Sequence, residues 1–257
     1  KSSSFAALII YTVIFLILFI GAASNDYDAN QSDKLECQMM NMGALYPPAI
    51  HYDYHLYLLV TPIYMVAGAV DWIINSFVIC FTFFFLERMY QRWKFIFIFV
   101  ISFLIGNIFT AVTEIDGVWS GATYGSSGLL GLNLIFLFTH LKNVDSKEFN
   151  RGSLFILYGL AMLAFFIFIP LAPNVSVPGH VMAFITGACW GGCFSIPHKR
   201  GDTVRKNVRT AKIFIYAGTV FLIFVCFILV LALNGDFDEK CKSGTFNHCE
   251  IKCDGYQ

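Results

Sequence analysis

The chain has 257 residues, of which 57% are hydrophobic and only 13% are charged, and its mean hydropathy is +0.66. A soluble domain carries about a quarter charged residues, so this composition excludes an ordinary soluble protein and predicts an integral membrane protein. The 17 basic and 17 acidic residues balance to a formal net charge of zero, so the charge gives no support for a nucleic-acid partner.

Apolar segments follow one another along the chain, and each approaches the roughly 20 residues that a helix needs to cross a bilayer. They lie at 5–22, 67–86, 94–113, 122–140, 153–170, 179–197 and 211–233. The pattern predicts an all-α polytopic membrane protein of seven spans. Its parts are a first transmembrane helix in 1–22, a first loop at 23–66, core helices in 67–197, a basic loop at 198–210, a seventh helix at 211–233 and a cysteine-containing tail at 234–257.

The first segment has a second interpretation. Lys1, the apolar run and the letters GAAS at 21–24 also fit a secretory signal peptide. The run is long for the apolar part of a signal, so we expect a retained helix. Cleavage would leave six spans and the same first loop.

The orientation follows from the basic residues, which gather on the cytoplasmic side of membrane proteins. With the N-terminus inside, the segments between the second and third, fourth and fifth, and sixth and seventh helices are cytoplasmic and basic. The basic residues left on the other side are Lys34, Lys240, Lys242 and Lys252. We therefore expect a cytoplasmic N-terminus and a C-terminus outside or in a lumen.

The cysteines and glycosylation sequons agree with this orientation. It places Cys37, Cys241, Cys249 and Cys253 on the outer side, where they are disulfide candidates of open connectivity. The sequons at Asn30 and Asn174 fall on the same side and are glycosylation candidates. Together these features favour the secretory pathway or the cell surface.

Several motifs occur in a fixed order between about residues 40 and 197. They are GALYPPAIHYDYHLYLLVTPIYMVAGAVDWIIN at 43–75, Glu87-Arg88, Gly106-Asn107, GATYGSSGLLG at 121–131 and GHVMAFITG at 179–187. In order and spacing they resemble eukaryotic rhomboid intramembrane proteases of the secretory-pathway type. The resemblance implies a rhomboid-like polytopic bundle with a six-helix core, to which this chain adds a seventh C-terminal helix.

The family's chemistry uses a serine at the start of the fourth helix and a histidine on the sixth helix as its base. His180 occupies the base position, and Ala183 and Gly187 would allow the sixth helix to pack closely on the fourth. For the nucleophile, the tetrapeptide GSSG favours Ser127. The longer pattern, which continues into LLG at 129–131, selects Thr123 instead.

In the longer register the residue after the nucleophile is Tyr124, which would thrust its ring into the substrate cavity, where the family has glycine. The oxyanion side, which side chains of the second helix supply in the family, also departs from the pattern. Asn75 fits, but Asp71 and Val66 replace two histidines and Leu58 replaces an arginine of the first loop. Asp71 also has a purely structural interpretation, as an anchor at the helix N-terminus, where the helix dipole favours negative charge.

These departures predict a pseudoprotease similar in kind to iRhoms, which keep the fold and bind transmembrane clients without cutting them. The first alternative is an active intramembrane serine endopeptidase using Ser127 and His180, with Asn75 as an oxyanion donor. The second is a structural subunit of a larger membrane complex. Geometry distinguishes the first two, since an active enzyme needs Ser127 within hydrogen-bond reach of His180, whereas the pseudoenzyme has Thr123 there.

The remaining motifs predict no cofactor and no metal. Cys189 and Cys193 lie one turn apart and are interpreted as core residues. His51 and His55, with Asp53 between them, would suit a metal only in a helical loop, and interfacial positions among tyrosines are favoured. The expected partners are membrane lipids, which the basic stretch 198–212 suits, and transmembrane-helix clients or partner membrane proteins, without nucleic acid.

Overall fold

The computed structural model describes residues 39–40, 42–52, 54–65, 69–86, 92–115, 117–140 and 175–195, with scattered helical residues within 9–16, 156–167 and 212–229. The long helices are α4 (Ala69–Leu86), α5 (Arg92–Thr113), α6 (Ala122–His140) and α8 (Val177–Ser195). The first loop contains α3 (Pro47–Tyr52), η1 (Leu56–Leu59) and η2 (Thr61–Tyr64). The described residues are thus helical or irregular, apart from one isolated β-bridge between Leu45 and Trp119.

The described helices follow the predicted spans closely. Within the described residues, the helix long and apolar enough to cross a membrane is Trp93–Thr113, and shorter apolar helices lie at Asp71–Cys80, Ala122–Phe138 and Ile215–Val225. The predicted helix at 122–140 agrees with α6 at both ends, whereas α4 and α5 differ from the prediction at their first residues. The first helix and the outer tail lie largely or wholly outside the described residues.

The sixth predicted helix begins at Val177 rather than at residue 179, and its end shifts equally to Ser195. Ser176 explains the start, because its Oγ accepts a hydrogen bond from the backbone N–H of Gly179 at 3.2 Å, as an N-cap side chain does. Pro178 fits the first turn, where its missing N–H costs no helical hydrogen bond. His180 consequently lies in the first turn of α8, four residues after the capping residue Ser176.

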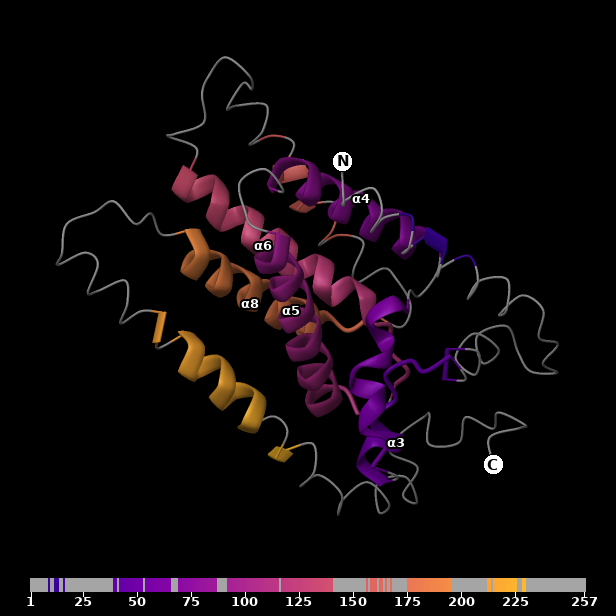
Figure 1. Ribbon diagram of the computed structural model, residues 1–257. Helices are drawn as coiled ribbons and strands as arrows, with labels where there is room; N and C mark the ends of the chain where they lie inside the picture. The colour runs from indigo at the N-terminus through magenta and orange to yellow at the C-terminus, as the bar shows by residue number, and fades with distance from the viewer. Residues whose placement is uncertain are drawn as a thin grey trace.

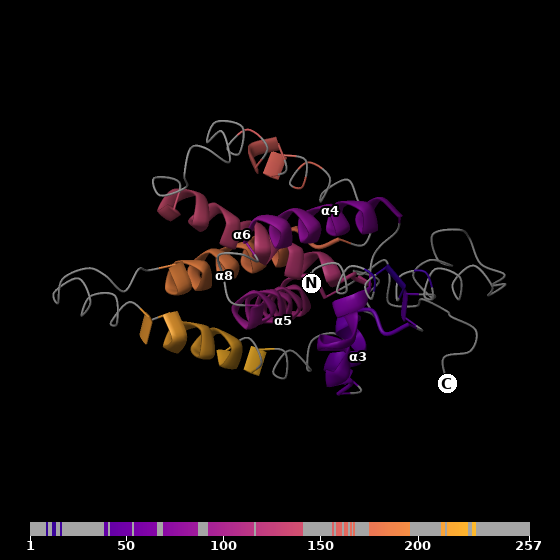
Figure 2. The same cartoon turned by 45° about the horizontal axis from the view of Figure 1, so that its top comes forward.

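Helices α6 and α8 lie side by side, with α5 against them and α4 on the other side of α6 (Figures 1 and 2). Glycines make the contacts this close. A side chain at Gly187 of α8 would collide with the backbone of Gly128 on α6, and one at Gly131 would meet the carbonyl of Phe184. Such small residues let the backbones of membrane helices approach one another.

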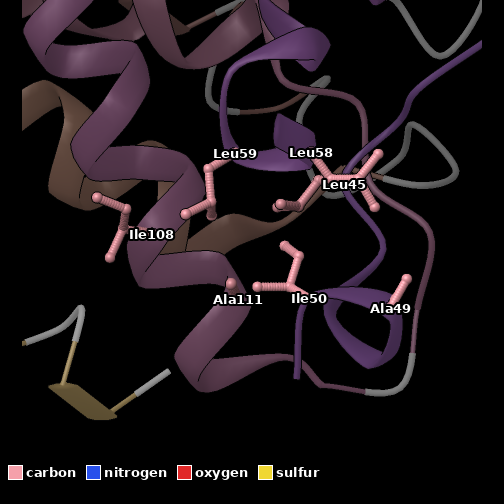
Figure 3. Packing of buried hydrophobic residues seen from close by; sticks show 7 residues of the cluster. All are labelled: Leu45, Ala49, Ile50, Leu58, Leu59, Ile108 and Ala111. Atoms are coloured by element: carbon pink, nitrogen blue, oxygen red, sulfur yellow. The ribbon is translucent and has the colours of Figure 1, made fainter. Parts of the chain in front are cut away.

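The first loop folds onto the C-terminal half of α5 (Figure 3). One hydrophobic cluster joins the loop to the helix: Leu45, Ala49, Ile50, Leu58, Leu59, Ile108 and Ala111. His51 adds a hydrogen bond from Nε2 to the carbonyl oxygen of Ala111 at 3.2 Å. The loop is therefore a packed part of the fold, held against α5.

Candidate functional site

His180 is fully buried in the first turn of α8. Its Nδ1 lies in hydrogen-bond contact with the carbonyl oxygen of Ser176. Because a carbonyl only accepts, Nδ1 carries the proton and Nε2 of the neutral ring presents a lone pair. Within the part of the chain that the structure describes, Nε2 has no hydrogen-bond partner. His180 thus has the orientation of a base, without a hydroxyl bound to it.

Ser127 lies on α6 and is fully buried. Its hydroxyl donates to the backbone carbonyl oxygen of His180 at 2.8 Å, and not to the imidazole. A hydroxyl has a single proton to donate, and here the backbone receives it. Ser127 therefore links α6 to α8 in the way that small polar residues link membrane helices, and in this arrangement His180 does not activate it.

Thr123, the second residue of α6, is also buried. Its Oγ1 has no hydrogen-bond partner among the described residues. Neither geometry that the sequence suggested is therefore present, because neither Ser127 nor Thr123 donates to Nε2 of His180.

An aromatic ring packs against the imidazole instead. Tyr124 and His180 meet edge to face, with ring centroids 4.6 Å apart and planes at 62°. Phe165 lies on the fifth predicted helix, and the centroid of its ring is 5.9 Å from the centroid of the same imidazole. Two aromatic side chains from different helices thus enclose His180, and both are almost completely buried.

The ring of Tyr124, which was expected to project into a substrate cavity, is fully buried between helices. A Cβ at Gly106 of α5 would lie 2.7 Å from the ring, and one at Gly179 of α8 would lie 2.8 Å from it. Two glycines on two helices therefore form a slot for the ring. The physical reason is that the missing side chains leave just the space that the phenol fills.

The hydroxyl of Tyr124 is held as firmly as its ring. Thr110 Oγ1 on α5 lies 3.0 Å from the phenol oxygen and 3.1 Å from Ser176 Oγ at the cap of α8. Helices α5, α6 and α8 thus meet in one buried group of hydroxyls. The sequence interpretation missed Thr110 and Ser176, although a serine before Val-Pro at a helix start is an N-cap signal that it could have used.

The residues expected on the oxyanion side face each other. Asn75 Nδ2 donates to Asp71 Oδ1 at 3.0 Å, one turn apart on α4, and both side chains are buried. The side chain of Asp71 therefore accepts the hydrogen bond that Asn75 would have to donate to an oxyanion. Asp71 lies in the first turn of α4, in agreement with its structural interpretation.

Of the other predicted site residues, one is buried in the core and the rest lie mostly outside the residues that the structure describes. Leu58, which replaces an arginine in the resemblance, is buried in the cluster between the first loop and α5. Outside the described residues lie Val66, Asp53, the sequon residues Asn30 and Asn174, and the outer cysteines Cys37, Cys241, Cys249 and Cys253. The hydroxyl residue of the second sequon, Ser176, is described, and it is fully buried as the cap of α8.

The weaker metal motifs can be compared with the structure directly. Helix α3 ends at Tyr52, so His51 is helical while His55 is not, and the two do not share a helical face. His51 is buried against α5. Among the described residues, no group of three His, Cys, Asp or Glu side chains could hold a metal ion. Cys189 and Cys193 are free thiols, and Cys193 is buried as expected of a core residue, whereas Cys189 is exposed, so its core interpretation is wrong.

Comparison with known families agrees with this arrangement of helices. A model of the Rhomboid domain matches residues 53–197, which span α4, α5, α6 and α8 and include Tyr124 and His180. A search of curated proteins finds no match to the chain. Because the matched segment covers more than half of the sequence, the chain belongs to the rhomboid family and is an all-α integral membrane protein.

Proposed function

We propose that this chain is a rhomboid pseudoprotease, which binds or escorts transmembrane partners without cleaving them. One observation carries the proposal: the ring of Tyr124 packs against the imidazole of His180 with ring centroids 4.6 Å apart, whereas a rhomboid protease needs the hydroxyl of its nucleophile against that imidazole. The hydroxyl of Tyr124 is held by Thr110, so the ring is fixed in place by hydrogen bonding as well as by packing.

Two further contacts support the loss of catalysis. The proton of Ser127 is committed to a backbone carbonyl, and general-base catalysis requires the nucleophile's proton to point at the base. The amide of Asn75 is committed to the side-chain oxygen of Asp71, whereas a protease needs such a donor for the oxyanion. An active enzyme would have to break both hydrogen bonds and move the ring of Tyr124.

Partner binding is the part of the proposal that rests on the family. Pseudoproteases of the rhomboid kind bind single-span helices from the side, and the exposed apolar side chains Ile73 and Phe77 of α4 offer such a helix a surface. The proposal includes the orientation expected from the basic residues, with a cytoplasmic N-terminus and a C-terminus outside or in a lumen of the secretory pathway.

The test uses the purified full chain in proteoliposomes with a panel of fluorescent single-span substrates and a fluorophosphonate probe. Wild type, Thr123→Ala, Ser127→Ala and His180→Ala are all expected to give neither cleavage nor labelling. Cleavage that is lost in Ser127→Ala and His180→Ala but kept in Thr123→Ala would overturn the proposal in favour of a serine endopeptidase. The converse pattern would identify Thr123 as the nucleophile.

Binding is measured in the same vesicles by energy transfer between the labelled chain and the labelled single-span helices. Association without cleavage is the expected result. A chain that binds none of these helices, but migrates with a fixed set of membrane proteins at constant stoichiometry, would instead be a structural subunit.

A further inference from the structure

A second cluster of aromatic rings lies at the end of α8 remote from His180. Trp93 meets Phe194 with ring centroids 5.7 Å apart, and Phe97 meets Trp190 at 4.7 Å. Trp190 also meets Tyr216 at 4.6 Å, which joins α8 to the helical segment around 212–225. This segment runs beside α8 in both views (Figures 1 and 2). The rings therefore tie α5, α8 and the C-terminal segment together at one corner of the bundle.

Lys94 packs against the rings of this corner. Its Nζ lies 5.4 Å from the ring centroid of Phe194 and 5.8 Å from that of Trp93, so it has cation–π contacts with two helices. The rings hold the ammonium in position, and its N–H groups are hydrogen-bond donors that an anion can accept from. A lysine held in this way is a preorganised cation.

A second cation comes from the C-terminal segment. Lys212 lies one helical turn before Tyr216, whose ring packs on Trp190 of α8 with centroids 4.6 Å apart, and this contact brings the segment to the end of α8. Lys94 and Lys212 are far apart in the sequence and are brought to the end of α8 by α5 and by the C-terminal segment. The corner thus combines two positively charged side chains with a cluster of aromatic rings.

An apolar strip on α5 continues away from the two lysines. Trp93, Ile96 and Val100 follow one another at helical spacing, and their side chains are 57%, 58% and 36% exposed. They belong to the helix Trp93–Thr113, which is long and apolar enough to cross the membrane. We therefore expect Lys94, at the start of this helix, at the depth of the lipid headgroups and the strip at the depth of the acyl chains.

We propose that the corner formed by Lys94, Lys212 and Trp93 binds the phosphate headgroup of an anionic phospholipid, whose acyl chains lie along Ile96 and Val100. Basic pockets between transmembrane helices bind anionic headgroups by charge, and an interfacial tryptophan holds the boundary between headgroup and chain. The proposal is independent of whether the chain cleaves its partners, since no residue near His180 takes part.

The experiment is native mass spectrometry of the full chain released from nanodiscs of phosphatidylcholine doped with phosphatidylserine. The variants are Lys94→Gln, Lys212→Gln and the double variant, with Lys147→Gln, between the fourth and fifth predicted helices, as a control of equal charge change. We expect retention of phosphatidylserine over phosphatidylcholine. Retention should fall about fivefold for each corner lysine removed, the size of a single basic residue's contribution at a membrane surface.

Two further arms make the result decisive. Lys94→Arg keeps the charge and should keep the lipid, and soluble glycerophosphoserine, which lacks acyl chains, should not compete. Equal retention of both phospholipids, or an equal loss in Lys147→Gln and Lys94→Gln, would overturn the proposal and leave only diffuse attraction by charge. Competition by glycerophosphoserine would also overturn it, because the site would then bind a free phosphate group.

Discussion

At the scale of single residues, the candidate site is defined by how Tyr124 fits its neighbours. A tyrosine inserted into an ordinary rhomboid-like interface would overpack it, and overpacking costs about 1–3 kcal/mol. Here Gly106 and Gly179 leave the space and Thr110 binds the hydroxyl. The tyrosine is therefore an integrated part of this core, and it covers one side of His180.

This fit predicts how substitutions of Tyr124 act on stability. Tyr124→Phe keeps the ring but removes the hydroxyl bound to Thr110, and it should lower the free energy of unfolding by about 1 kcal/mol. Tyr124→Ala should lower it by about 3–5 kcal/mol, because a cavity remains. The measurement is unfolding in mixed detergent followed by circular dichroism.

The matched control for this series is Tyr57→Ala, since Tyr57 is 53% exposed in the first loop. It should change the free energy of unfolding by less than about 0.5 kcal/mol, as surface substitutions usually do. Equal effects at the two tyrosines would mean that the ring of Tyr124 is not packed in the slot.

At the scale of elements, the contact between α6 and α8 depends on glycine in some positions and not in others. Gly187 and Gly192 lie on the same helix. A Cβ at Gly187 would collide with the backbone of Gly128, which cannot move aside like the end of a flexible side chain. At Gly192, by contrast, no atom of the described residues lies within 4 Å of a Cβ. The two positions form a matched pair.

Gly187→Ala should therefore destabilise the protein by about 1–3 kcal/mol through overpacking, and Gly192→Ala should be neutral or stabilising, because alanine favours the helix by up to about 1 kcal/mol. Thermal unfolding of both variants in detergent gives the comparison. A more harmful substitution at Gly192 would contradict the close approach of α6 and α8.

The first loop has its own requirement for glycine. Gly43 has a φ of +87° and its carbonyl oxygen accepts a hydrogen bond from Thr61 Oγ1 at 2.6 Å. A left-handed conformation costs an L-residue about 1–2 kcal/mol, so Gly43→Ala should lower stability by that amount. Gly218→Ala, at a position with open space, is the control. Limited proteolysis should cut the first loop faster only in Gly43→Ala, and equal rates would contradict the prediction.

At the scale of the whole molecule, the orientation predicts which sequon is glycosylated. Both sequons are expected on the outer side, but Ser176 of the second is buried as the cap of α8. After expression in secretory cells, a glycosidase should therefore shift the mobility of wild type and of Asn174→Gln, but not of Asn30→Gln. Absence of any shift would contradict the orientation, and a shift lost only in Asn174→Gln would contradict the role assigned to Ser176.

Much of the architecture could be predicted from the sequence. Hydropathy alone places α6 at 122–140 and brings α4, α5 and α8 within two residues of their observed bounds, because a bilayer imposes one length and one kind of residue on every span. The ordered motifs identified the rhomboid family, since they lie within or beside the segment that the Rhomboid domain matches.

The sequence by itself determined a membrane protein of the rhomboid family with an altered nucleophile motif, because length, hydropathy and motif order are local properties of the chain. Only the tertiary structure decided what those altered residues do. The proton of Ser127 goes to the carbonyl of His180, and the ring of Tyr124 enters a slot made by glycines on α5 and α8. These contacts join residues some 18 to 55 positions apart, and the packing of three helices sets them, which no local pattern encodes.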